Sequence, residues 1–297
     1  MIARWQRLFV AAWCVAALGW TAFAWGRPWP WMAAGWLLLL GSHATVLGLE
    51  FLAAARVGRQ GPSPHPTGRQ WWRAWLAECG WSPRMWAWRQ PFRSRRFPDN
   101  FPAADGRRGM VLVHGFAGNR GFWLPWLKAL RADGRCFAAV DLEPPLGGID
   151  GFVATVDAAV RRVHAATGRP PLVVAHSMGG LVVRAWWCRS GGQVPVHRIV
   201  TLATPHAGTW MARIGRAASS PEMRIGSAWL QALDAAQACV PPVRFTCWYS
   251  NCDNMVFPAA TATLPGADNR AAHGLAHVEL AFAPQVVRHT LALLDAD

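Results

Sequence analysis

The protein has 297 residues and a formal net charge of +14, with 53% hydrophobic and 15% charged residues. This length accommodates one domain of ordinary size beside a smaller module, and it excludes two large domains. The seven cysteines occur singly, without the spacing of a zinc site or a disulfide framework, so we expect free thiols.

Two uncharged segments lie near the N-terminus. Residues 8–26 and 28–49 contain no Asp, Glu, Lys or Arg. Each is about long enough to cross the roughly 30 Å hydrocarbon core of a bilayer as a helix. Glycine and proline at residues 26–30 predict a tight turn between them, and the tryptophans there are typical of the headgroup boundary. We therefore predict two transmembrane helices that form a hairpin over residues 1–56.

The arginines around this hairpin predict its orientation. Arg4 and Arg7 precede the first segment, four arginines follow the second within residues 56–73, and only Arg27 lies in the turn. The positive-inside rule then places both ends, and the chain that follows, on the cytoplasmic side of a bacterial inner membrane. A cleaved signal peptide is the alternative, with Ala-Phe-Ala at residues 22–24 as the cleavage site. The second segment would then anchor the chain in the reverse orientation.

Residues 57–108 are predicted to connect the hairpin to the rest of the chain. Three prolines within residues 61–66 exclude a regular helix or a central strand and indicate an extended linker. Tryptophans and arginines then alternate. Residues 56–108 contain 11 arginines and three acidic residues, which is a net charge of +8.

This Trp/Arg-rich segment suits an interfacial position on an anionic membrane, at about 1 kcal/mol for each well-placed cation. Alternatively, some of its tryptophans cover the core of the following domain. GC-rich coding is another source of the arginine excess, since Lys128 is the only lysine. We expect no nucleic-acid partner, because the segment adjoins an apolar span and matches no nucleic-acid-binding module.

From residue 109 onward, short apolar runs alternate with helical patterns, which predicts an α/β fold with a mostly parallel sheet. About six strands flanked by helices are expected over residues 109–297. Five of them are near-continuous apolar runs, as strands covered on both faces should be, and residues 86–95 could supply an extra edge strand. The five runs are residues 110–113, 137–142, 172–175, 199–203 and 243–249.

Ser177 lies where the third of these runs ends and a helix begins. Residues 175–180 read Ala-His-Ser-Met-Gly-Gly, so a serine occupies the bend and glycines follow it. This pattern departs from Gly-x-Ser-x-Gly only in that Ala175 replaces the first glycine. A sharp strand-to-helix bend exposes a serine hydroxyl above the sheet. We predict that Ser177 is a nucleophile.

An acid and a histidine follow in the order that such a serine requires. Asp253 comes just after the apolar run at residues 243–249, and His277 precedes a final helical pattern at residues 284–294. A histidine activates a serine as general base, and a carboxylate holds the histidine tautomer. We predict Ser177, His277 and Asp253 as a catalytic triad, with Asp268 and His273 as the fallback pair.

Residues 109–297 resemble the α/β-hydrolase superfamily, nearest its bacterial lipase and esterase branch. The resemblance rests on the serine bend, the Val-His-Gly-Phe stretch at residues 113–116, the acid and the histidine. Residues 204–209, Thr-Pro-His-Ala-Gly-Thr, are also similar to a stretch of those lipases. The resemblance covers about two thirds of the chain, and the membrane hairpin is not part of the usual lipase pattern.

The resemblance implies an oxyanion hole formed by the backbone N–H groups of Phe116 and Met178. His114 and His206 are expected to be structural, and His114 precedes the nucleophile, which does not fit a general base. The chain shows no metal-binding or phosphate-binding motif, so we expect no metal and no cofactor.

The predicted function is a membrane-anchored serine carboxylester hydrolase that acts on lipids or other apolar acyl esters. Phe122, Trp123 and Trp126 are candidates for the walls of an acyl groove, although ordinary core packing is the alternative for each. The same triad could instead serve a thioesterase, an amidase or an acyltransferase. A non-enzymatic membrane interaction protein is the remaining alternative. The sequence indicates no oligomeric state.

Overall fold

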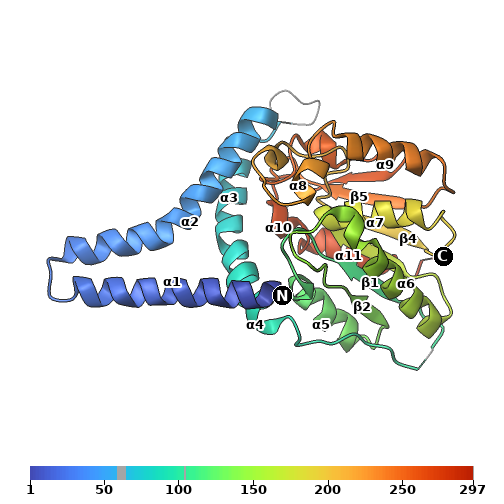
Figure 1. The fold of residues 1–297 in the computed structure, drawn as a ribbon, viewed down its shortest axis with the longest axis horizontal. Coiled ribbons are helices and arrows are strands. Elements are labelled where there is room, and N and C mark those ends of the chain that lie inside the picture. The colour runs from blue at the N-terminus through green and yellow to red at the C-terminus, as the bar shows by residue number, and fades with distance from the viewer. Residues whose placement is uncertain (59–64, 104, 297) are drawn as a thin grey trace.

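The computed structural model describes residues 1–58, 65–103 and 105–296. Residues 110–271 contain a six-stranded parallel sheet with the strand order β2-β1-β3-β4-β5-β6 (Figure 1). The predicted α/β fold with about six strands is confirmed. The strands are β1 Met110–Val113, β2 Phe137–Ala139, β3 Leu172–His176, β4 Arg198–Leu202, β5 Phe245–Tyr249 and β6 Asp268–Ala271.

Helices cover both faces of this sheet because side chains alternate along each strand. In β1, Met110 and Leu112 pack toward the face covered by α5 and α11, and Val111 and Val113 pack toward the face of α6, α7 and α9. The helices of this domain are α5 Leu124–Ala132, α6 Val153–Thr167, α7 Met178–Arg189, α8 Ser219–Glu222, α9 Ala228–Ala238, α10 His277–Leu280 and α11 Pro284–Ala292.

The sixth strand is not where the sequence analysis placed it. Residues 86–93 are helical in the structure and residues 94–95 form a turn, and the edge strand is β6, which pairs in parallel with β5. The side chains of β6 alternate between half-buried and exposed, as an edge strand permits. Polar residues such as Asp268 and Arg270 therefore form a strand without an apolar run.

Two long apolar helices precede the sheet and project from it as a hairpin (Figure 1). Helix α1 extends over Ile2–Ala24 and α2 over Trp29–Gly58, with Gly26 in the left-handed region at the turn. Both are long and apolar enough to cross a membrane, and only 11% and 17% of their most apolar windows are buried. A helix in the core of a soluble protein would be mostly buried, so these two are not core helices, and they are compatible with a transmembrane hairpin.

Helix α2 is longer than the predicted second span. Its 30 residues extend about 45 Å at 1.5 Å per residue, which exceeds the roughly 30 Å hydrocarbon core. The last part of α2 accordingly turns toward the domain that contains the sheet, and Leu47, Phe51 and Ala54 are buried there. The end of α2 is thus part of the folded domain.

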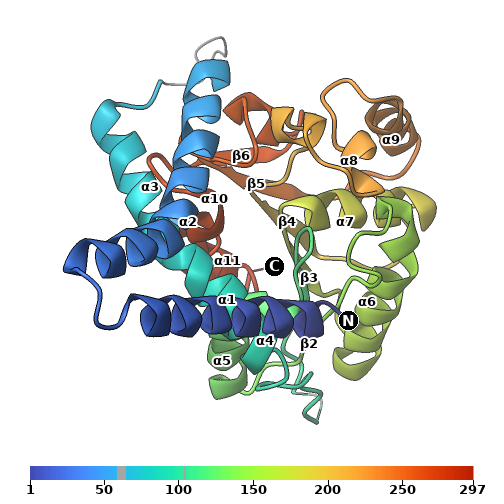
Figure 2. The ribbon, with the colours of Figure 1, turned by 60° about the vertical axis from the view of Figure 1, so that its left-hand side comes forward.

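The Trp/Arg-rich segment is one helical run over the catalytic domain. It consists of α3 Gly68–Pro83, a π-helical turn Arg84–Arg89 and α4 Gln90–Arg93. Helix α3 packs against the end of α2 and against α10 (Figures 1 and 2). Its tryptophans divide between two roles: Trp81 stacks on Phe282, whereas Trp72 is 62% exposed. Most of the predicted proline-rich linker lies outside the described residues.

Candidate active site

Ser177 occupies a strained bend between β3 and α7. Its φ of 55° and ψ of −132° lie in a region that non-glycine residues rarely adopt. Close packing around this bend requires glycine at two positions, Gly115 in the loop after β1 and Gly179 in the first turn of α7. A Cβ atom on Gly115 would lie 2.8 Å from the Cβ of Ser177, and one on Gly179 would lie 2.4 Å from the carbonyl oxygen of His114. The glycines therefore let the nucleophile loop and the loop after β1 approach each other.

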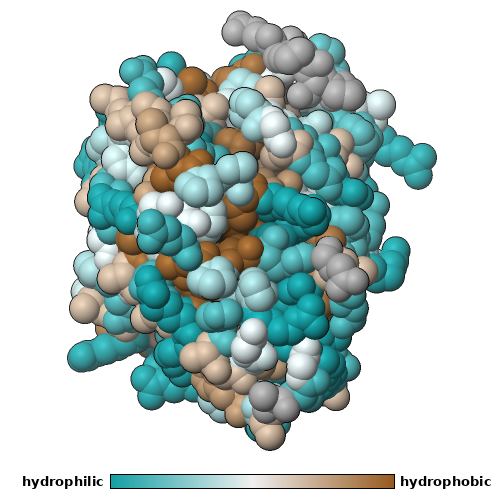
Figure 3. Space-filling view, turned by 90° about the vertical axis from the view of Figure 1, so that its right-hand side faces the viewer, coloured by the Kyte–Doolittle hydropathy of each residue, from teal (hydrophilic) through white to brown (hydrophobic). Residues whose placement is uncertain are grey.

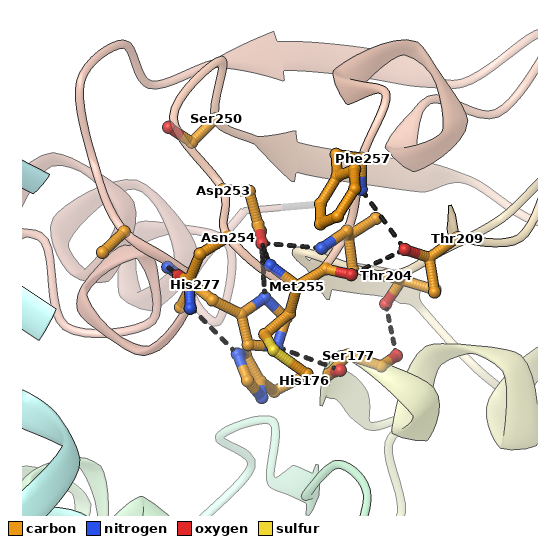
Figure 4. A network of polar contacts seen from close by, with 12 residues as sticks. His176, Ser177, Thr204, Thr209, Ser250, Asp253, Asn254, Met255, Phe257 and His277 are labelled. Carbon is orange, nitrogen blue, oxygen red and sulfur yellow. Dashed lines mark hydrogen bonds and ion pairs between the residues drawn. The ribbon is translucent and has the colours of Figure 1, made fainter. Parts of the chain in front are cut away.

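The structure brings Ser177, His277 and Asp253 together in one hydrogen-bonded chain (Figure 4). Nε2 of His277 lies 3.1 Å from Oγ of Ser177, and Nδ1 lies 2.9 Å from the nearer carboxylate oxygen of Asp253. Asp253 and His277 are buried, whereas Ser177 is partly exposed. A base within hydrogen-bond reach of a nucleophile, itself oriented by a carboxylate, is the arrangement that activates a serine.

Backbone groups hold the acid in place. The N–H groups of Met255 and Val256 both donate to Oδ1 of Asp253, each at 2.8 Å. Asn254 accepts a hydrogen bond from the backbone N–H of His277 at 3.3 Å and donates one to Glu50 of α2 at 2.8 Å. A hydrogen-bonded path therefore leads from the apolar hairpin to the catalytic histidine candidate.

The electrostatics favour a protonatable base at this position. Burial lowers the pKa of His277, but the Asp253 carboxylate, with a smaller contribution from Glu50, raises that pKa above the ordinary value. Burial also holds the pKa of the neighbouring His176 well below its ordinary value, so His176 is neutral. The ring of His176 stacks on Phe122, and its Nε2 lies 3.2 Å from the carbonyl oxygen of His277.

Of the two predicted oxyanion donors, Met178 directly follows Ser177 in the chain, and Phe116 lines the same cavity. Met178 begins α7, where the backbone N–H groups have no partner within the helix. Phe116 belongs to the loop after β1, and its side chain lines the same cavity as Ser177. His114 forms no part of the triad: it is buried, and its Nε2 accepts a hydrogen bond from the backbone of Leu142 at 3.0 Å.

A cavity of about 230 Å³ opens at Ser177 and His277. One wall comes from the catalytic domain and includes Phe116 and Phe122. The opposite wall comes from the N-terminal helices and consists of Leu47 and Glu50 of α2, Glu78 and Ser82 of α3, Trp86 of the π-helical turn and Gln90 of α4. The N-terminal helices thus supply six of the 17 residues that line the cavity, and four of these six belong to the segment predicted to be interfacial.

Two of the three predicted groove residues lie elsewhere. Phe122 lines the cavity, but Trp123 is completely buried and Trp126 is 2% exposed within the core between the sheet, α5 and α11. Nε1 of Trp126 donates to the carbonyl oxygen of Ala281 at 2.9 Å. Both tryptophans therefore support the fold and do not contact the cavity.

Specific polar contacts fasten the helical wall to the catalytic domain. Arg73 of α3 forms a paired hydrogen bond with Glu279 at 2.7 and 3.0 Å and donates to the carbonyl oxygen of Gly274, in the loop before His277. Near the start of α1, Gln6 donates to Gln90 and accepts from Asn119. The N-terminal amine also pairs with Glu143. Both ends of the hairpin therefore contact the catalytic domain.

No sequence motif indicated a role at the site for Glu50, Glu78, Gln90, Asn254 or Arg73. One signal for the first of them was available, since Glu50 is the only Asp, Glu, Lys or Arg between Arg27 and Arg56. An isolated ionisable residue at the end of an apolar span often marks a functional site. The contacts of the others join segments far apart in the chain, and no local pattern encodes them.

His206 and Asp268, which the sequence also singled out, contribute to the fold and lie outside the triad. His206 is buried and its Nε2 lies 2.9 Å from Oγ1 of Thr201. Asp268 lies in β6 and pairs with Arg270, away from Ser177. Among the described residues, no group of three His, Cys, Asp or Glu side chains is arranged to hold a metal ion.

The sequence of residues 110–294 matches the family model described as alpha/beta hydrolase family. Because the match covers more than half of the chain, this protein belongs to the alpha/beta hydrolase family. A comparison with curated proteins found no match.

Solved lipase structures have the same fold. The mature form of lipase BlEst2 from Bacillus licheniformis is similar to 67% of this chain over 96% of its own, with a TM-score of 0.58 and 18% identity. Lipase B from Aspergillus fumigatus is similar to 68% of this chain over 56% of its own, with a TM-score of 0.56 and 16% identity. At such identities the likeness establishes the fold, and the chemistry must be argued from the site.

Proposed function

We propose that this protein is a membrane-anchored serine carboxylester hydrolase. The observation that carries the proposal is the continuous hydrogen-bonded chain from Ser177 through His277 to Asp253, placed at a cavity. Membership of the alpha/beta hydrolase family supports hydrolytic chemistry at this site.

The proposed reaction begins when Oγ of Ser177 attacks the acyl carbon and His277 takes the serine proton. His277 then returns that proton to the leaving alcohol, which leaves an acyl-enzyme, and water repeats the sequence to release the acid. Asp253 stabilises the imidazolium that forms in both steps. The N–H groups of Phe116 and Met178 would stabilise the negative oxygen of each tetrahedral intermediate, and one such donor is typically worth about 100- to 1,000-fold in rate.

The cavity supports apolar acyl esters as the substrate class. Leu47, Trp86, Phe116 and Phe122 contribute apolar surface within reach of the nucleophile. Trp86 and Phe116 are each 36% exposed, so apolar side chains also surround the entrance. Lipid-like esters could therefore enter from an apolar environment.

A membrane is the environment that we propose for the hairpin. The outer surfaces of α1 and α2 expose large apolar side chains such as Phe9, Leu18 and Leu38. The face of the molecule opposite the hairpin is mostly hydrophilic (Figure 3). Insertion of the hairpin would leave the catalytic domain on the side of both helix ends, and the arginine distribution favours the cytoplasmic side.

The first experiment measures hydrolysis of p-nitrophenyl esters of increasing chain length by the full-length protein in lipid nanodiscs. We expect Ser177→Ala to abolish the activity, and Ser190→Ala, at the surface end of α7, to retain it. Labelling of the wild type but not of Ser177→Ala by a fluorophosphonate probe would identify the nucleophile. A folded wild type that hydrolyses no ester and resists the probe would refute the proposal.

The orientation has a separate test. Cys239 is exposed on the catalytic domain. A membrane-impermeant maleimide should therefore label Cys239 in inside-out vesicles and not in intact spheroplasts. Cys239→Ser provides the control for labelling of the other cysteines. The reverse pattern would place the catalytic domain outside the cytoplasm, as the signal-peptide alternative requires.

A further inference from the structure

Two buried polar groups in the cavity are not used by the proposed triad. Glu78 is 3% exposed and Gln90 is completely buried, and both line the cavity that contains Ser177. Within residues 1–58, 65–103 and 105–296, Oε2 of Glu78 and Nε2 of Gln90 have no hydrogen-bond partner. Buried polar atoms of native proteins are nearly always paired, and each exception requires an explanation.

The orientation of the Gln90 amide is set by its neighbours. The backbone N–H of Asn119 donates to Oε1 of Gln90 at 3.1 Å, and Nε2 of Gln6 donates to the same oxygen at 3.1 Å. Because a backbone N–H can only donate, this atom of Gln90 is the oxygen. The unpaired atom is therefore the amide nitrogen, which is a hydrogen-bond donor.

Glu78 also presents a donor at neutral pH. Burial raises the pKa of Glu78 to about 8, and the nearby Asp253 and Glu50 carboxylates add to that shift. Below that pH the side chain is a neutral carboxylic acid. One of its oxygens accepts from the backbone N–H of Val278, which leaves a hydroxyl that can donate or accept.

The position of Glu78 in the cavity indicates which part of an ester substrate it would contact. Val278, its backbone partner, is the residue after His277. In the proposed reaction the alcohol leaves on the side of His277, because His277 protonates the leaving oxygen. Glu78 is thus placed near the alcohol part of the substrate.

A hydroxyl group matches both unpaired atoms. Its oxygen can accept from the Gln90 amide or the Glu78 acid, and its hydrogen can be donated back to Glu78. A cation would not pair with the Gln90 donor. The cavity has a volume of about 230 Å³, which is large enough to admit a small alcohol.

We propose that Glu78 and Gln90 form a subsite for free hydroxyl groups on the alcohol part of the substrate. The preferred substrates are then acyl esters of a small polyol in which at least one hydroxyl remains unesterified. This inference rests on the proposed ester-hydrolase function, and it adds the N-terminal helices to the residues that determine specificity.

The test compares two esters with the same acyl chain, the glycerol 1-monoester and the propyl ester of decanoic acid. We expect the full-length protein to prefer the glycerol ester about 10-fold or more in kcat/KM, because the site would lose its hydrogen bonds with the propyl ester. Glu78→Met should reduce this ratio to about 1. Glu78→Gln, which keeps a donor, should retain most of it.

Two further variants complete the design. Gln90→Met removes the unpaired nitrogen and leaves no donor in its place, so it should also reduce the ratio. Glu222→Met is the matched control, because Glu222 lies outside the cavity, and it should leave the ratio unchanged. These variants keep the proposal testable if Glu78→Met does not fold.

The outcomes separate the two proposals. Equal hydrolysis of the two esters by the wild type, or an unchanged ratio in folded Glu78→Met, would overturn the subsite and leave the hydrolase proposal intact. Hydrolysis of neither ester, together with resistance of Ser177 to a fluorophosphonate probe, would instead overturn the proposed function.

Discussion

The contact between Glu50 and Asn254 gives the sharpest prediction about how the hairpin affects the site. Substitution of Glu50 by Ala removes the acceptor of the Asn254 amide at 2.8 Å. Asn254 is completely buried, and its Oδ1 accepts from the backbone N–H of His277. Loss of one contact should therefore loosen the residue that holds His277.

The magnitude follows from the kind of hydrogen bond. A bond between an amide and a carboxylate typically contributes about 1.5–3 kcal/mol net. Because Glu50 is only partly buried, the lower end of that range applies, about 1.5 kcal/mol. If this free energy is lost from the positioning of His277, kcat/KM falls about 10-fold at 1.4 kcal/mol per decade.

The assay is p-nitrophenyl ester hydrolysis by the full-length variants in nanodiscs, with thermal unfolding measured in parallel. Leu49→Ala is the control, since Leu49 is the neighbouring residue on α2 and is 62% exposed. Glu50→Gln keeps an acceptor but removes the charge, so it should retain most of the rate.

A pH profile separates positioning from a general loss of stability. The Glu50 carboxylate contributes to the raised pKa of His277, so Glu50→Gln lowers that pKa. Because the base must be neutral, the acidic limb of the profile then moves to lower pH. Wild-type activity in Glu50→Ala, with an unmoved limb in Glu50→Gln, would refute the proposed path from the hairpin to the histidine.

The other predictions concern the triad and its surroundings. Because the pKa of His277 is raised, kcat/KM of the wild type should increase with pH through a midpoint above the ordinary value of 6.5, and a midpoint below it would contradict the assigned role of Asp253. Gly115→Ala should reduce kcat by about 100-fold or more, because the new Cβ would displace Ser177. Gly151→Ala is the control and should stay active, because nothing lies within 4 Å of a Cβ atom at that position. Equal rates of ester hydrolysis in the two variants would refute the packing argument. Arg73→Ala should lower the unfolding free energy by about 1–2 kcal/mol and reduce the rate, with partial recovery in Arg73→Lys, as measured by thermal unfolding and ester hydrolysis.

The sequence predicted what local patterns encode. Apolar runs identified five strands because strands covered on both faces need continuous apolar residues. The bend at Ser177 was recognisable because few residue types fit between a strand and a helix in such close packing. The edge strand β6 was not predicted, because a half-exposed strand can contain polar residues such as Asp268 and Arg270.

The opposite wall of the pocket could not be predicted in the same way. Glu78 and Gln90 reach the cavity because a π-helical turn separates α3 from α4 and because α3 lies across α10. Neither feature produces a periodic pattern of apolar residues in the sequence. The prediction that Trp123 and Trp126 line an acyl groove was wrong for a related reason. An apolar helical pattern predicts that both side chains are buried, but it does not predict which surface covers them.

The shared pocket has a consequence for how this protein can be divided. A fragment that begins at residue 109 would retain Ser177, Asp253 and His277 and would look complete by its motifs. It would lack every side chain that α2, α3 and α4 contribute beside the nucleophile. The substrate profile of such a fragment would describe a different, more open enzyme. Because α2, α3 and α4 are synthesised before Ser177 and His277, the cavity that they share forms only after the later residues have folded.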